Sequence, residues 1–177
     1  MSQLKDLLVE ELQDLYHAEM QLTKALPKMA AAAHNPKLRE AFEKHLTQTQ
    51  GHVERLKKAF ELLGAQAQAK PCKAMEGLVA EGEETIAEGK DKEALAADLA
   101  LITAAQKVEH YEISGYGTLR GLARQIGQFD VSKLLTHTLG EEESTDFLLT
   151  EIAKPIIQQA TSEIFEAQTG KKQTAGV

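Results

Sequence analysis

Acidic and histidine side chains recur at helical spacing along this 177-residue chain. In the segment AAQKVEHYEISGYG, residues 104–117, the spacing places Glu109 and Glu112 on the same helical face as Ala105 and Tyr116. A helix that buries this face buries two carboxylates, and an ionised carboxylate without a partner is very costly away from water. The sequence therefore calls for a partner that neutralises these acids.

Ligand-type side chains also interrupt the apolar faces of three other segments. Glu19 lies within a run of regularly spaced leucines, and His45 and His52 lie on the apolar face of the next segment. The simplest partner for several buried carboxylates is one metal cation or two, and carboxylates with imidazoles suit iron, manganese or zinc better than copper. The predicted metal ligands are Glu19, His52, Glu109, Glu112, Glu142, Glu143 and Asp146.

A comparison with di-metal sites in helical bundles gives a partial match. Such sites use a Glu from each of two helices and a Glu-x-x-His motif from each of the other two. Glu19 and Glu109 fit the single-Glu positions. In the last segment Glu143 and Asp146 have the three-residue spacing, and Glu142 and Asp146 have a four-residue spacing. The second segment lacks the carboxylate, because the residues three and four positions before its histidine are Thr49 and Gln48.

Local interpretations that need no metal remain open for each of these residues. His45 and His52 can be core histidines that hydrogen-bond to carboxylates, and Glu112 can pair with Tyr116 one turn away. Acidic runs such as 141–143 are typical of a solvated helix face. A basic side chain can also neutralise a buried carboxylate, although at a large desolvation cost. The candidates for that role are Arg55 and Arg120.

Four long amphipathic segments and one short segment would position these side chains. Helices are predicted over 3–31, 36–63, 73–88, 92–126 and 130–166. Asn35 followed by Pro36 is typical of a helix start, and Gly64 is typical of a helix end. The pattern predicts an all-α, ferritin-like four-helix bundle, in which a long crossover carries a short fifth helix. Residues 1–166 would form a single domain, and the tail 167–177 is predicted to be disordered.

Composition excludes several classes of function. The net charge is −7 and no basic cluster stands out before the tail, which argues against binding of nucleic acid. No apolar run is long enough to span a membrane, and the charged N-terminal segment does not resemble a signal peptide. The single cysteine, Cys72, cannot form an internal disulfide. A soluble protein of the reducing cytoplasm is therefore expected.

Several stretches resemble the YciE/YciF-type stress proteins of the ferritin-like superfamily. The resemblance implies a four-helix bundle with a short fifth helix, a homodimer, and a role in the bacterial general stress response. It also implies a di-iron or di-manganese site that acts on a small-molecule oxidant. The family often has HLEET where this chain has HLTQT, so that Gln48 replaces a carboxylate of the second helix. The stretches are 14–30, 38–56, 71–78, 104–119 and 139–146.

Two functions follow from these observations. The first is a metal-dependent oxidoreductase of the peroxidase, catalase or ferroxidase type, with one or two iron or manganese ions. The second is a non-catalytic dimeric stress protein whose metal site is incomplete or absent. The density of acids on the third and fourth long helices favours the first, and Gln48 favours the second.

Overall fold

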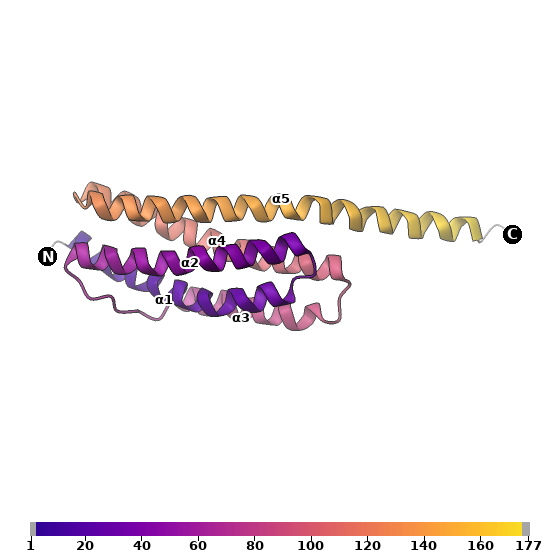
Figure 1. The fold of residues 1–177 in the computed structure, drawn as a ribbon, viewed down its shortest axis with the longest axis horizontal. Coiled ribbons are helices and arrows are strands. Elements are labelled where there is room, and N and C mark those ends of the chain that lie inside the picture. Colours follow the sequence, from indigo (N-terminus) through magenta and orange to yellow (C-terminus); the bar gives the residue numbers. More distant parts are fainter. Residues whose placement is uncertain (1–2, 175–177) are drawn as a thin grey trace.

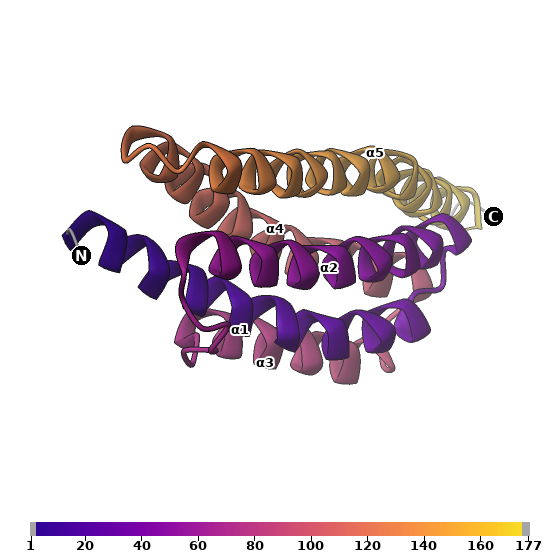
Figure 2. The same ribbon diagram turned by 60° about the vertical axis from the view of Figure 1, so that its left-hand side comes forward.

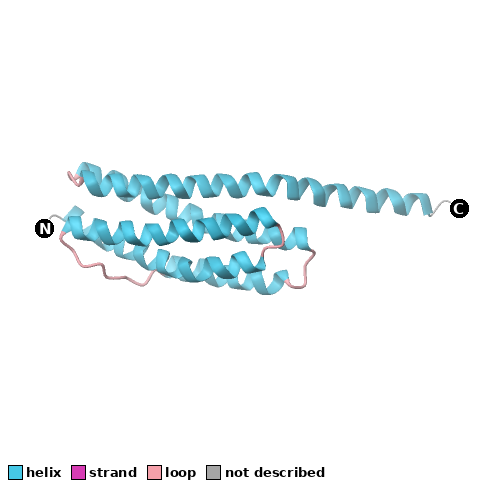
Figure 3. Cartoon of the chain, viewed as in Figure 1, coloured by secondary structure: helices cyan, strands magenta, loops and turns pink. Residues whose placement is uncertain are grey.

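The structure, a computed structural model, describes residues 3–174 of the chain, and the side chains of residues 3–166. Its described part consists of helices and connecting loops without any strand, as Figure 3 shows. None of the described helices is long and apolar enough to cross a membrane. The helices are α1 (Gln3–Ala32), α2 (Pro36–Leu63), α3 (Lys73–Gly89), α4 (Ala94–Gln125) and α5 (Phe129–Thr174).

The four long helices form a bundle of two antiparallel pairs, α1 with α2 and α4 with α5 (Figure 1). The chain passes from the first pair to the second through a loop and α3, which lies against α1 and α4 (Figure 2). Helices α2 and α4 consequently run in the same direction, so the connection must cross the length of the bundle. The predicted all-α bundle, with a crossover that carries a short fifth helix, is confirmed.

The ends of α2 are defined by the residues that the sequence indicated. The Asn35 side chain accepts hydrogen bonds from the backbone N–H groups of Lys37 and Leu38, which have no partner within the helix. Gly64 ends α2 in the left-handed region, with φ at 66°. The crossover loop can therefore leave the bundle directly after α2.

A buried carboxylate of α4 fixes the turn between α1 and α2. Asp98 is buried, and its two carboxylate oxygens each accept a hydrogen bond at 2.8 Å, one from the backbone N–H of His34 and the other from that of Asn35. This contact joins the first helical pair to the start of α4. It therefore sets where the inner faces of the two pairs meet.

Helix α5 is longer than the sequence indicated. It was expected to end near residue 166, but it continues to Thr174 and projects beyond the bundle (Figure 1). No Gly or Pro stands between residues 156 and 169 to end it. Pro155 lies inside the helix without ending it. The backbone of 167–174 is thus helical rather than a disordered tail, and the remaining residues of that predicted tail, 175–177, lie outside the described part.

Two apolar clusters fill the bundle, and a polar layer separates them. The cluster toward the α1–α2 turn includes Leu22, Leu26, Phe42, Leu101 and Leu149. The cluster toward the opposite end includes Leu8, Leu12, Phe60, Leu119 and Leu135. Between them, each of the four long helices contributes a buried acid or histidine. Apolar packing on both sides keeps water away from this layer and fixes the side chains within it.

Candidate metal centre

The polar layer contains six ionisable side chains that are at most 2% exposed. They come from all four long helices, although they lie far apart in the sequence. The helical period places them on the inward faces, in line with the leucines above and below. The six residues are Glu19 from α1, His45 and His52 from α2, Glu109 and Glu112 from α4, and Glu142 from α5.

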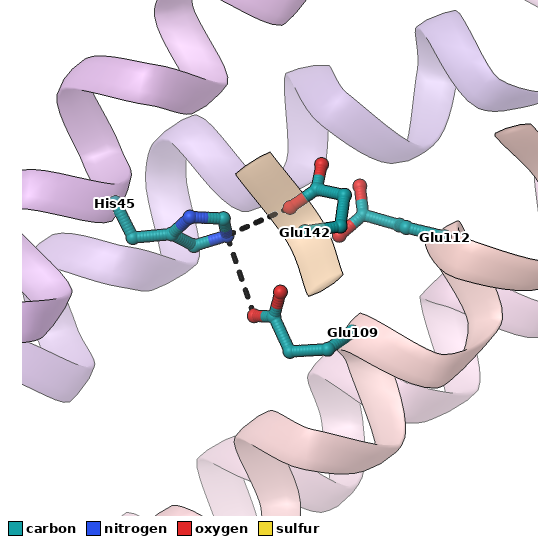
Figure 4. A group of neighbouring side chains, drawn as sticks. All are labelled: His45, Glu109, Glu112 and Glu142. Atoms are coloured by element: carbon teal, nitrogen blue, oxygen red, sulfur yellow. Dashed lines mark ion pairs between the residues drawn. The ribbon is translucent and has the colours of Figure 1, made fainter. Parts of the chain in front are cut away.

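Four of these side chains form a first group that can hold a metal ion. His45, Glu109, Glu112 and Glu142 each offer one ligand atom, and these atoms lie within 4.8 Å of one another. Nε2 of His45 is 3.3 Å from Oε1 of Glu109 and 3.5 Å from Oε2 of Glu142, as Figure 4 shows. Three carboxylates and one imidazole are a donor set that suits iron or manganese.

A second group of potential ligands lies beside the first. It consists of Glu19, His52 and Glu142, whose ligand atoms are also within 4.8 Å of one another. Nδ1 of His52 is 2.9 Å from Oε1 of Glu142 and 3.2 Å from Oε1 of Glu19. Glu142 belongs to both groups, and it offers one oxygen to each histidine. Its carboxylate therefore lies where it can bridge two ions.

The ligand atoms of this layer lack the hydrogen bonds that buried polar atoms normally make. Both oxygens of Glu112 and of Glu142 make no hydrogen bond, and neither does Nδ1 of His52, which contacts Glu142 only as an ion pair when the ring is protonated. Glu19, His45, Thr49 and Glu109 each contribute one further atom of this kind. Among the described residues, every buried side-chain oxygen or nitrogen without a partner belongs to this layer. Such atoms are costly, and their concentration at one place fits a site for cations.

The ring of His52 is oriented from outside the cluster. Its Nε2 lies 3.0 Å from Oε2 of Glu141, and that carboxylate also forms an ion pair of 2.6 Å with Arg55. The position of Arg55 explains why Glu141, despite its partial burial, has a pKa below the ordinary value. An ionised Glu141 favours a proton on Nε2 of His52, which leaves Nδ1 to face Glu19 and Glu142. Metal-binding histidines are commonly oriented by a carboxylate in this way.

A threonine of α5 performs the same role for His45. The hydroxyl of Thr145 donates to the backbone carbonyl of Glu141 at 3.0 Å, as threonines in helices often do. Its oxygen can then accept from Nδ1 of His45, which lies 3.2 Å away. This arrangement places the proton of the neutral ring on Nδ1. The unprotonated Nε2 is therefore directed at Glu109 and Glu142, which is the form needed for binding a metal.

Burial opposes negative charge in this layer. It raises the pKa of Glu109 and of Glu112 well above the ordinary value, and the neighbouring carboxylate of Glu142 raises both further. Burial alone would lower the pKa of His52, but the Glu142 and Glu19 carboxylates outweigh it and raise this pKa to about 10. Without cations, protons must therefore neutralise the cluster. Cations that bind there would displace these protons.

Two of the predicted ligands lie outside the cluster. Glu143 is exposed, because it follows the inward-facing Glu142 and is rotated by about 100° around α5. Asp146 is half-buried, and its Oδ1 accepts a hydrogen bond of 2.9 Å from Gln106 and lies 3.3 Å from Nε2 of the exposed His110. These contacts hold Asp146 at the α4–α5 surface, away from the two core histidines. The other five predicted ligands are all found in the polar layer.

His45 is the member of the cluster that was not among the predicted ligands. It precedes His52 by seven residues, which is two helical turns, so the spacing placed both rings on one face. What the sequence does not reveal is which ring has a nitrogen aimed at carboxylates of other helices. Both rings do, through contacts between residues more than 60 positions apart.

Of the metal-free pairings suggested by the sequence, both histidines do lie beside carboxylates, but the pairing of Glu112 with Tyr116 and the neutralisation of a buried carboxylate by arginine are not formed. The hydroxyl of Tyr116 donates to Glu19 of α1 rather than to Glu112. Arg55 pairs with Glu141 at the edge of the bundle, and Arg120 is exposed. No lysine or arginine among the described residues forms an ion pair with a carboxylate of the buried cluster.

On α2, a threonine occupies the inward position that a carboxylate would have in a Glu-x-x-His motif. Thr49 is fully buried three residues before His52, and its hydroxyl oxygen has no hydrogen-bond partner. Gln48, which stands where the YciE/YciF-type proteins often have a carboxylate, is only half-buried and is adjacent to His45. The group formed by Glu19, His52 and Glu142 is therefore one carboxylate short of the complete bundle motif.

Fold and site together define a helical-bundle protein with a buried carboxylate–histidine cluster. Comparison with known proteins shows that the chain belongs to the family described as a domain of unknown function, DUF892, which matches residues 3–162. It is 46% identical to Protein YciF of Escherichia coli (strain K12) over 154 residues. This aligned stretch covers 86% of this chain and 92% of that protein. The resemblance to YciE/YciF-type proteins is thereby confirmed.

Solved structures agree with this assignment. The crystal structure of the E. coli stress protein YciF has a TM-score of 0.84 and 45% identity, and the match covers 89% of this chain and 99% of that one. YcfI from Rhodopseudomonas palustris has a TM-score of 0.80 and 40% identity over 85% of this chain and 94% of its own. A protein from Xanthomonas campestris shares the fold, with a TM-score of 0.69 at 23% identity over 92% of this chain and 98% of that one.

Proposed function

We propose that this relative of a stress protein holds two divalent iron or manganese ions in its core and acts on peroxide or dioxygen. The observation that carries the proposal is the set of buried ligand atoms without hydrogen bonds, all of which belong to one layer. When ionised, Glu19, Glu109, Glu112 and Glu142 carry four negative charges, which two divalent cations would balance. No lysine or arginine of the described bundle supplies that charge, and a protonated His52 balances only one of the four.

The positions of these residues indicate which of them would bind each of the two ions. Glu109, Glu112 and His45 would hold one ion, Glu19 and His52 the other, and the Glu142 carboxylate would contact both. Iron or manganese, when bound there, supplies the capacity to exchange electrons with an oxidant. Glu141 and Thr145 would keep the two imidazoles oriented. Tyr116, whose hydroxyl donates to Glu19, holds a proton at the edge of the cluster.

Metal content measured by elemental mass spectrometry tests this proposal. Wild-type protein, purified without a His-tag or chelator, should contain about two ions per chain. Glu142→Ala should lose both ions, while Glu19→Ala and Glu109→Ala should each lose the ion of their own group. The control is Glu143→Ala, which removes the adjacent but exposed carboxylate of α5 and should retain both. Equal metal content in Glu142→Ala and Glu143→Ala would overturn the assignment.

The second candidate function is a non-catalytic stress protein without metal. Thr49 favours it, since the group around His52 lacks a carboxylate. In that case Glu112→Gln should be tolerated or should raise the melting temperature, because it removes a buried acidic group whose oxygens have no partner. A Thr49→Glu variant, which places a carboxylate at the inward position, separates a lost site from a site that never existed. Metal content that rises from one ion to two would show that the absence of this carboxylate cost an ion, whereas Gln48→Glu at the half-buried neighbour should have a smaller effect.

The proposal includes a homodimer located in the cytoplasm. Exposed apolar side chains on the bundle could be covered by a second copy, and the free, buried Cys72 suits a reducing compartment. The exposed residues include Leu4, Leu7, Phe147 and Ile157. Analytical ultracentrifugation of the full chain tests the dimer, and a monomer at all concentrations would exclude it.

A further inference from the structure

A mostly apolar cavity connects the surface of the bundle to the metal-ligand cluster. It is lined by residues of α1, α2, α3 and α4 and offers about 40 Å³ of space to molecules the size of water. His45 and Glu109 form its inner end, and both belong to the first ligand group. The walls are aliphatic and aromatic, and include Leu22, Leu26, Phe42, Val79, Ala105 and Val108.

The outer end of the cavity lies under an exposed ion pair. Nζ of Lys28 on α1 is 2.5 Å from Oε1 of Glu83 on α3, and both side chains are more than half exposed. These two residues also line the cavity. The same space therefore extends from side chains in contact with solvent to ligands that are at most 2% exposed.

We propose that this cavity, here called the apolar passage, admits a small uncharged oxidant of the size and polarity of dioxygen to the cluster. This inference rests on the proposed function. Transfer of an ion into apolar surroundings is very costly, so the walls discriminate against anions and hydrated cations. The volume of about 40 Å³ exceeds the roughly 10–15 Å³ that one water requires, but it leaves no room for a bulky organic oxidant.

Helix α3 forms the outer wall of the passage, and one of its lining residues is a glycine, which has no side chain to occupy the passage. Gly82 lines the passage, and a Cβ atom built on it would meet no atom within 4 Å. A larger side chain at this position has open space to occupy, and because Gly82 lines the passage we expect that side chain to extend into it. Gly77 of the same helix also has nothing within 4 Å, but it is exposed and does not line the passage.

The first experiment compares Gly82→Leu with Gly77→Leu. Both variants replace a helical glycine by leucine, so their effects on helix propensity are matched. In protein loaded with Fe²⁺, the rate of oxidation by dioxygen should fall about tenfold or more in Gly82→Leu, which corresponds to about 1.4 kcal/mol in the barrier. It should be unchanged in Gly77→Leu, and the iron content should be unchanged in both. Equal rates in the two variants would overturn the proposal.

The second experiment needs neither metal nor turnover. Apolar cavities bind xenon, which can be detected in metal-free protein by NMR or in xenon-pressurised crystals. Xenon should occupy the apolar passage in wild-type protein and in Gly77→Leu, and should be absent from Gly82→Leu. Failure of xenon to enter wild-type protein would overturn the passage. Ala25→Leu, which fills the passage from α1, replaces Gly82→Leu if that variant does not fold.

The two experiments separate failure of this inference from failure of the proposed function. Wild-type protein that binds xenon but no metal would refute the metal centre, and with it the oxidant route, while the cavity itself would stand. Protein that binds metal, but is oxidised equally fast when the passage is filled, would refute the route alone.

Discussion

Glu112 provides a direct test of how the buried cluster is neutralised when metal is absent. Its carboxyl group is completely buried and makes no hydrogen bond, and burial raises its pKa well above the ordinary 4.5. Because the pKa is higher in the folded than in the unfolded state, the contribution of this group to stability is complete below about pH 4.5. That contribution is lost as the pH rises toward the folded-state pKa.

The size of the effect follows from proton linkage. While Glu112 keeps its proton in the folded state and loses it on unfolding, it lowers the free energy of unfolding by about 1.4 kcal/mol per pH unit. Glutamine has the shape of the protonated side chain and does not titrate. Compared with Glu112→Gln, the metal-free wild type should therefore lose about 1.4 kcal/mol of stability for each pH unit above about pH 5, until the pH reaches the folded-state pKa.

Urea unfolding at several pH values, with a chelator present, measures this difference. Glu143→Gln serves as the control, because it changes an exposed carboxylate on α5 and should leave the pH dependence of the wild type unaltered. Excess Mn²⁺ should remove the loss of stability in the wild type, because a bound cation displaces the protons. Parallel stability curves for metal-free wild type and Glu112→Gln would refute the reasoning that burial holds a proton on Glu112.

Two further predictions concern the scaffold that positions the cluster, and both use chemical denaturation. A Cβ at Gly115 of α4 would lie 2.9 Å from Cδ2 of Leu15, whereas a Cβ at Gly117 would meet no atom within 4 Å. Gly117→Ala should therefore stabilise the protein by about 1 kcal/mol, and Gly115→Ala should stabilise it by clearly less. Equal gains would show that Leu15 yields without cost. Asp98→Ala removes the acceptor for two backbone N–H groups of the α1–α2 turn and should cost about 2 kcal/mol. An unchanged urea midpoint would mean that water replaces the carboxylate there.

The helices were predictable from the sequence because their signals are local. Regular spacing of apolar residues, Asn35 before Pro36, and Gly64 after α2 each act within a turn or two. The inward direction of Glu19 followed from the leucines on either side of it for the same reason. The end of α5 was misjudged because no residue there ends a helix, and the boundary had followed from the expectation that a chain terminus is disordered.

The membership of the cluster was harder to predict, because it depends on rotation between helices. Glu142 and Glu143 are adjacent, and the apolar pattern of α5 did not decide between them, but the structure buries the first and exposes the second. Asp146 has the correct spacing for a ligand, yet Gln106 of α4 provides its partner. The orientation of His45 depends on Thr145, 100 residues away. Such contacts are set by tertiary packing and leave no local signal.

The two ligand groups are unequal, and this inequality has a consequence for metal binding. The first group has three carboxylates and an imidazole, whereas the second has two carboxylates and an imidazole and shares Glu142 with the first. Thr49 stands where the bundle motif has a carboxylate, and its hydroxyl is a neutral and weaker metal ligand. Because Glu142 is shared, the first ion to bind also uses part of the charge available to the second. Titration calorimetry with Mn²⁺ should therefore show two steps of different affinity, and Glu19→Ala should remove the weaker one. Two equivalent steps would refute the inference that the missing carboxylate on α2 weakens the second group.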